Sequence, residues 1–190
     1  MWDRRLIGAA GLAYASTLVV GLAALTPRPA RAQADVTVSE RSFDCIRNGT
    51  KVRNSYIRNA DPKLLAEAVR IFRDSVPDVE YPVGTIVQLI PAEAMVKHPR
   101  ARFPATHGWE FFALDLSPQG TKITARGDSV VNFIGVTCLS CHQAAVRFDF
   151  VCEQGHGCAP VPLTDEIIAE RQSKDPRCPA NPDAGKKAGL

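Results

Sequence analysis

The pattern of hydrophobic and polar positions changes near Tyr81. Before it, Asp61-Pro62 supplies a helix N-cap followed by proline at the first helical position. The apolar residues behind this pair share one helical face: Leu64, Leu65, Ala68, Val69 and Phe72. We therefore expect a helix that begins at Asp61-Pro62 and ends by Pro77. Residues 35–60 are mostly polar, with Cys45 as the one unusual residue.

After Tyr81 the chain is divided into short segments rich in β-branched and aromatic residues, with Pro, Gly and Ser-Pro-Gln-Gly turn signals between them. These segments are residues 83–90, 94–97, 109–116, 122–125 and 130–136. They predict an antiparallel sheet of about five strands, packed with helices in an α+β fold. Two further helices are expected, one over residues 141–148 and one capped by Thr164 that runs towards Ser173. Residues 35–175 then form one domain, and residues 176–190, rich in Pro, Lys, Ala and Gly, are expected to be disordered.

The N-terminus has the features of an export signal. Arg4 and Arg5 precede an apolar run over residues 6–25, and Ala30-Arg31-Ala32 or Ala32-Gln33-Ala34 offers a cleavage site. We expect a cleaved signal peptide over residues 1–34 and a periplasmic or otherwise exported protein. An uncleaved membrane anchor is the alternative, because the apolar run is long enough to span a bilayer.

Removal of the signal changes the charge balance. The chain has 23 Lys+Arg and 20 Asp+Glu, and residues 1–34 contain four Arg and one Asp, so 23 − 4 = 19 basic and 20 − 1 = 19 acidic residues remain. A net charge near zero gives no indication of a nucleic-acid partner.

The sequence Cys138-Leu139-Ser140-Cys141-His142 has the spacing of a c-type haem attachment site. Each thiol adds to one vinyl group of the porphyrin, and the adjacent histidine is then held where its imidazole can bind the iron. We expect one covalent haem c per chain, with His142 as the proximal ligand. The motif lies late in the chain and no methionine follows it, since Met95 is the one methionine left after signal removal. Small electron-carrying cytochromes have the opposite arrangement, and the strand-rich stretch before the motif argues against a four-helix cytochrome c-prime.

Several segments, in the same order, resemble the cytochrome P-460 family, which includes the beta-type cytochromes c-prime. They are Pro82-Val83-Gly84-Thr85, Ala94-Met95-Val96-Lys97, Gly108-Trp109-Glu110-Phe111-Phe112, the haem motif, and Phe148-Asp149-Phe150-Val151. The resemblance implies a five-stranded antiparallel sheet around a single haem, with His142 below the iron and an open or apolar distal side.

One departure from the family pattern bears on the activity. In the hydroxylamine-oxidising members, a lysine on the strand after the Gly-Thr pair is joined to the porphyrin. Here that strand, residues 84–90, has no lysine, and Leu89 stands about where it is expected. Lys97 aligns with a different lysine of the family. The chain is therefore more similar to the beta-type cytochromes c-prime, which bind nitric oxide or similar molecules at five-coordinate iron.

Other residues are candidates for the distal site. Glu93 could move protons as a distal carboxylate, although a carboxylate at a strand edge is more often solvated. The aromatic candidates for lining the pocket are Phe103, Trp109, Phe111 and Phe112. Strand alternation sends Phe111 and Phe112 to opposite faces, so at most one of them lines it. The candidate sixth ligands, all expected in exposed loops, are His98, His107 and His156.

The four remaining cysteines, Cys45, Cys152, Cys158 and Cys178, are an even number in an oxidising compartment. Disulfides are expected, with three pairings open. A structural zinc site made by Cys138, Cys141, Cys152 and Cys158 is a rival interpretation.

The sequence as a whole predicts an exported mono-haem cytochrome that binds, or carries out redox chemistry on, a small nitrogen ligand such as nitric oxide or hydroxylamine. It leaves open whether the protein is an enzyme. An electron-transfer cytochrome with both axial positions filled is the main alternative, and a redox partner protein or a homodimer is compatible with both.

Overall fold

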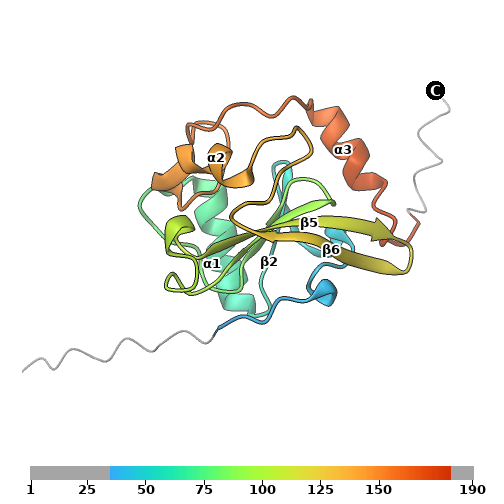
Figure 1. The fold of residues 1–190 in the computed structure, drawn as a ribbon, viewed down its shortest axis with the longest axis horizontal. Coiled ribbons are helices and arrows are strands. Elements are labelled where there is room, and N and C mark those ends of the chain that lie inside the picture. Colours follow the sequence, from blue (N-terminus) through green and yellow to red (C-terminus); the bar gives the residue numbers. More distant parts are fainter. Residues whose placement is uncertain (1–34, 181–190) are drawn as a thin grey trace, which may run out of the picture. The chain divides into compact units, whose positions relative to one another are not determined.

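The computed structural model describes residues 35–180, which form one six-stranded antiparallel sheet with helices around it (Figure 1). The strands lie side by side in the order of the chain. Their bounds are β1 Thr50–Val52, β2 Ser55–Arg58, β3 Ile86–Gln88, β4 Glu93–Lys97, β5 Trp109–Ser117 and β6 Gly120–Gly127. The predicted antiparallel sheet and the α+β class are confirmed. The predicted signal peptide lies outside the described residues, as does the predicted tail from residue 181 onward.

Two strand predictions need correction. The hairpin of β1 and β2 adds two strands in the polar stretch before α1, and its turn has no glycine because Arg53 itself takes a φ of 51°. Residues 130–136 are not a strand, and form only the isolated bridge from Val131 to Thr137. Asn132 and Gly135 fold this segment back on itself, since the side chain of Asn132 accepts from the backbone N–H groups of residues 134 and 136.

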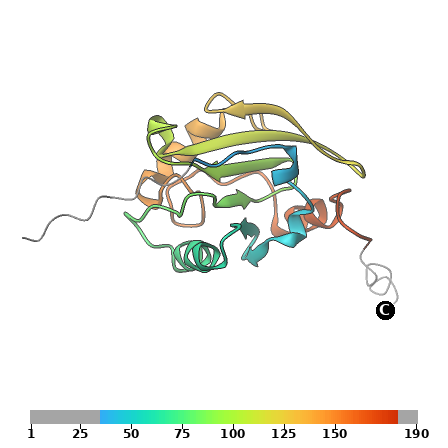
Figure 2. The ribbon, with the colours of Figure 1, turned by 90° about the horizontal axis from the view of Figure 1, so that it is seen from below.

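Helix α1, Pro62–Asp74, begins where the sequence predicts. The carboxylate of Asp61 accepts hydrogen bonds from the N–H groups of Lys63 and Leu64, which satisfies donors that the first helical turn leaves free. The helix ends before Pro77, because Ser75 takes a left-handed conformation with a φ of 48°. Its apolar stripe is buried against the sheet, and Figure 2 views the helix nearly end-on.

The strands β4 and β5 have two faces, and both are buried. Met95 and Lys97 of β4 lie on the same face as Trp109 and Phe111 of β5, and this face packs on α1 and on the Cys138–His142 segment. We call it the motif face. The opposite face, which we call the outer face, contains Ala94, Val96, Phe112 and Leu114, and packs against Val38 and Phe43 of the N-terminal segment. The predicted separation of Phe111 from Phe112 is therefore confirmed.

The C-terminal segment is fixed to the start of the domain. Helix α3, Asp165–Ser173, is capped by the Thr164 hydroxyl as predicted. Beyond it, Cys178 forms a disulfide with Cys45, and the buried Arg177 pairs with Asp175 at 2.7 Å. The predicted disordered tail therefore does not begin at residue 176. The prediction of disorder rested on composition, which does not show that a disulfide and an ion pair order the backbone of residues 175–178.

Candidate functional site

The motif forms α2, Cys138–His142, a helix of five residues that continues as the 3-10 helix η4, Gln143–Phe148. Both motif cysteines carry free thiols. Cys138 is buried, and burial together with the nearby charge of Glu93 raises the pKa of its thiol to about 11. Helix α2 therefore contains two free thiols three positions apart along the chain, Cys138 buried and Cys141 half-buried, with the spacing of a c-type haem attachment site.

The imidazole of His142 is held in one tautomer. Its Nδ1 lies 2.6 Å from the carbonyl oxygen of Phe150. Because a carbonyl only accepts, Nδ1 carries the proton and Nε2 has the lone pair. Among the described residues Nε2 has no hydrogen-bond partner, and burial lowers the pKa of His142, which favours the neutral ring. The Phe111 ring packs on it, with 5.0 Å between the ring centroids.

The carbonyl that holds His142 belongs to a strained turn. Asp149 and Phe150 both have left-handed backbones, with φ values of 51° and 61°. Such a conformation costs on the order of 1–3 kcal/mol at a residue other than glycine, and persists where surrounding contacts fix it. Here the N–H of Phe150 donates to Ala145, and the N–H of Tyr81 donates to the Asp149 carboxylate at 2.8 Å.

Lys97 supplies the strongest of these contacts. Its buried ammonium group lies 2.7 Å and 2.8 Å from the two carboxylate oxygens of Asp149, and 2.6 Å from the carbonyl oxygen of His107. Glu80, His107 and Asp149 bring their ligand atoms within 4.8 Å of one another, an arrangement that could hold a metal ion. The Lys97 ammonium already contacts Asp149 and His107 and lies 3.6 Å from Glu80. Its positive charge therefore takes the place that a metal ion would have in this cluster.

Glu93 lies at the opposite end of β4 and contacts the segment before the motif. Its carboxylate accepts a hydrogen bond of 2.8 Å from the N–H of Phe133, and burial raises the pKa of the group. The guanidinium of Arg171 on α3 stacks over the Phe133 ring at 4.9 Å. Glu93 is thus a half-buried group that anchors residues 131–136 beside the motif, not a solvated one.

Large apolar side chains flank the motif and are exposed. Val131 is 53% exposed and Val146 is 46% exposed, and the others in the two adjoining segments are Phe133, Ile134 and Val136. Proteins rarely leave such a series in water unless a ligand or partner covers it. Free thiols, an available imidazole nitrogen and exposed apolar flanks together fit a covalently attached haem.

The four aromatic candidates are divided between the two faces. Trp109 and Phe111 lie on the motif face, and Phe111 touches His142. Phe112 lies on the outer face against Phe43, and Phe103 packs on His98. The structure therefore brings only two of the four to the side where the motif lies.

Two of the histidine candidates are buried, contrary to the expectation of exposed loops. His98 is fully buried, with Nε2 lying 3.0 Å from Glu110 and Nδ1 lying 3.3 Å from Asp35. These partners are remote in sequence, so the flanking loop signals did not reveal them.

His156 is also buried, stacked on Phe148 at a centroid distance of 3.7 Å, with its Nδ1 lying 2.6 Å from the carbonyl oxygen of Val151. His107 is half-buried against Phe150. Met95 is buried on the motif face, opposite Phe111 in the sheet.

The four remaining cysteines form two disulfides, Cys45–Cys178 and Cys152–Cys158. This selects one of the three pairings and fits an oxidising compartment. Cys152 and Cys158 are bonded to each other, so the four-cysteine zinc site loses two of its ligands and is wrong.

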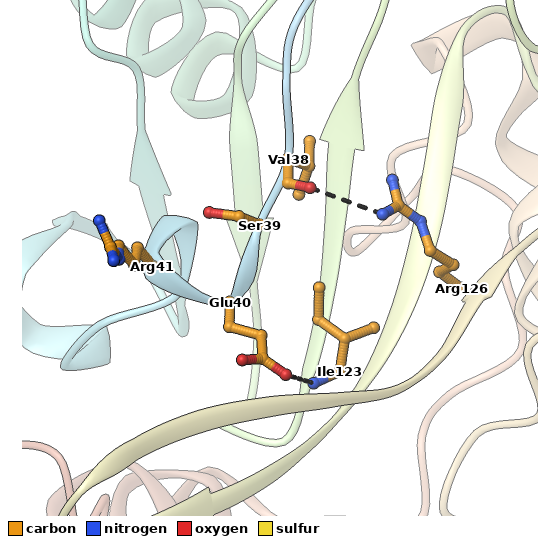
Figure 3. Close-up of a pocket in the computed structure, with 6 residues that line it drawn as sticks. All are labelled: Val38, Ser39, Glu40, Arg41, Ile123 and Arg126. Carbon is orange, nitrogen blue, oxygen red and sulfur yellow. Dashed lines mark hydrogen bonds between the residues drawn. The ribbon is translucent and has the colours of Figure 1, made fainter.

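A separate open groove of about 710 Å³ lies on the outer face (Figure 3). Its lining residues are Val38, Ser39, Glu40, Arg41, Ile123 and Arg126. Within the groove Glu40 accepts from the N–H of Ile123, and Arg126 donates to the carbonyl of Val38. These contacts fix the N-terminal segment against β6, and the groove includes none of the predicted site residues.

None of the helices within residues 35–180 combines the length and apolar character needed to cross a bilayer. Comparison of the chain with protein-family models, with curated proteins and with solved structures finds no match. The resemblance to the cytochrome P-460 family therefore stays a prediction that rests on the quoted segments.

Proposed function

We propose that the protein is an exported c-type cytochrome with one haem, and that it binds or transforms a small nitrogen ligand such as nitric oxide or hydroxylamine. Cys138 and Cys141 form the two thioethers, and His142 is the proximal ligand. The observation that carries the proposal is the geometry of His142. Its Nδ1–H is bonded to the carbonyl of Phe150, which leaves Nε2 available beside two free thiols.

When bound, the haem supplies an iron centre that exchanges one electron and coordinates a small molecule. The chain supplies the rest. The Phe150 carbonyl fixes the tautomer and orientation of His142, as the outer partners of metal-binding histidines do. The exposed apolar residues of the two flanking segments offer a surface for the porphyrin edge.

The contacts of the other histidines favour an open sixth position over the electron-transfer alternative. His98 lies between two carboxylates. The His156 ring is buried against Phe148 with its Nδ1 on the carbonyl of Val151, so its unpartnered Nε2 is enclosed by protein. Met95 and His107 are the other candidates for a sixth protein ligand among the described residues. Met95 is enclosed in the core, and His107 lies beside Asp149 at 3.6 Å.

Lys97 supports the non-crosslinked type. It is the lysine nearest to the family's crosslink position, and its amine is held as an ammonium by Asp149 at 2.7 Å. A porphyrin bond would require this amine to lose its proton and leave a buried carboxylate without its cation. We therefore assign the chain to the type that lacks the crosslink.

The test is expression of the full chain together with the cytochrome c maturation machinery. We expect denaturing mass spectrometry to give the processed chain plus one haem, and the C138S/C141S variant to give none. Carbon monoxide or nitric oxide should then change the spectrum of the reduced protein. A colourless wild type would refute the haem proposal. A coloured protein whose reduced spectrum ignores both gases would instead favour the electron-transfer alternative, and a further mass shift with a red-shifted ferrous Soret band would indicate a crosslink.

A further inference from the structure

The turn that holds His142 requires support from elsewhere in the fold. Asp149 and Phe150 are consecutive residues with φ of 51° and 61°, a conformation that is an outlier for a bulky side chain such as phenylalanine. The hydrogen bond from Phe150 N–H to Ala145 lies within the segment itself. A contact with another part of the fold must therefore hold this turn against the sheet.

The side chain of Asp149 makes that contact. It is 2% exposed and accepts from Lys97, which is 1% exposed, and from the N–H of Tyr81. Lys97 in turn donates to the carbonyl of His107 at 2.6 Å and lies 5.5 Å above the Trp109 ring. The ion pair thus joins the segment after the motif to β4 and to the loop before β5.

The geometry points to Lys97 and Asp149 as positioning residues for the proximal histidine, an inference that rests on the proposed function. The pair fixes the strained turn, the turn aims the Phe150 carbonyl, and the carbonyl accepts the Nδ1 proton of His142. A strong hydrogen bond at Nδ1 makes the imidazole a more basic ligand and sets its orientation. The pair therefore determines the strength of the iron–histidine bond without touching the iron.

A purely structural role would have a different signature, and the chain offers a matched control. Arg177 and Asp175 form a second ion pair of the same length, 2.7 Å, with side chains 3% and 0% exposed. This pair anchors the N–H of Ile46 and the carbonyl of Phe43, not the motif. Loss of one member of either pair should destabilise the fold, because it leaves the other buried charge alone. Only a change in the Lys97–Asp149 pair should alter the orientation of His142.

The experiment compares the haem-loaded wild type with K97M, with K97M/D149N and with R177M. The double variant removes both charges and leaves neither partner uncompensated, so it serves if K97M does not fold. The readouts are the iron–histidine stretching frequency of the ferrous protein by resonance Raman and the reduction potential, measured beside urea unfolding. We expect the stretching band of the Lys97 variants to move to lower frequency and the potential to rise, since a weaker Nδ1 hydrogen bond makes a less basic ligand. R177M should lose stability with both readouts unchanged. K97R, which keeps the charge, should give a smaller shift than K97M.

Three outcomes overturn the inference. Lys97 variants that lose stability while the band and the potential stay at wild-type values would show a structural role only. An equal shift in R177M would show that the band reports general loosening. A wild type without covalent haem would refute the proposed function and, with it, the inference, whereas the first two results leave the haem proposal standing.

Discussion

Phe111 and Phe112 are neighbours on β5 that test which face of the sheet serves the motif. Both are buried, with exposures of 2% and 0%, and both have an aromatic neighbour at a centroid distance of 5.0 Å. For Phe111 that neighbour is His142, and for Phe112 it is Phe43. We consider F111L and F112L, which keep an apolar side chain at each position.

The two substitutions should cost similar stability. Leucine has three carbon atoms fewer than phenylalanine, and at about 0.8 kcal/mol for each buried carbon the loss is about 2.4 kcal/mol, before any cavity forms. Urea unfolding of the haem-loaded proteins measures this loss. Both side chains are buried to a similar extent, one on each face of β5, so the two variants should have similar free energies of unfolding.

The spectra should differ. F111L removes the ring that packs on His142. The imidazole should then take more than one orientation, so the ferric electron paramagnetic resonance spectrum should broaden or divide into two species. F112L should leave this spectrum unchanged, since its contacts are Phe43 and the guanidinium of Arg126 at 5.1 Å on the outer face. A spectral change in F112L equal to that in F111L would refute the assignment of the motif to one face of the sheet.

Two further predictions concern stability. Removal of the Cys45–Cys178 disulfide, which closes a sequence separation of 133, should lower the free energy of unfolding by about 5 kcal/mol, and removal of Cys152–Cys158, separation 6, by about 2 kcal/mol. Chemical denaturation of the two double alanine variants checks this order, and an equal loss would contradict the loop-closure argument. Glu93 has a raised pKa in the folded protein, so its favourable contribution is present at low pH and is lost as pH rises through that pKa. The free energy of unfolding, measured from about pH 4 to pH 8, should therefore rise for E93Q relative to the wild type as the pH increases. Parallel stability curves for the two proteins would show that burial does not raise the pKa of Glu93.

The sequence predicts those parts of the fold whose signals are local. Asp61-Pro62 marks the start of α1, and the alternation along β4 and β5 gives both strands and the opposite orientations of Phe111 and Phe112. The β1–β2 hairpin was not predicted, because its turn uses Arg53 in place of glycine. The guanidinium of Arg53 donates to the carbonyls of Phe72 and Arg73 at the end of α1, a tertiary contact that no local pattern contains.

The candidate site divides in the same way. The motif residues are evident from spacing alone, but the partners that prepare His142 are not. Lys97 and Asp149 both lie in segments used for the family resemblance, yet nothing in either segment shows that the two side chains meet across 52 positions of sequence. The burial of His98 between Asp35 and Glu110 was not predicted for the same reason, since its partners come from the start of the domain and from β5.

The register of β4 connects these observations. Glu93 and Lys97 are four residues apart, so the period of two places both on the motif face with Met95 between them. Glu93 holds Phe133 before the motif, and Lys97 holds Asp149 after it, so one strand fixes both arms of the segment that carries Cys138 and His142. A slip of one residue would replace these contacts with Ala94 and Val96, which carry no polar group, and would turn two charges toward the outer face. The regular pairing of Glu93–Lys97 with β5 therefore places both anchors of the motif segment at once.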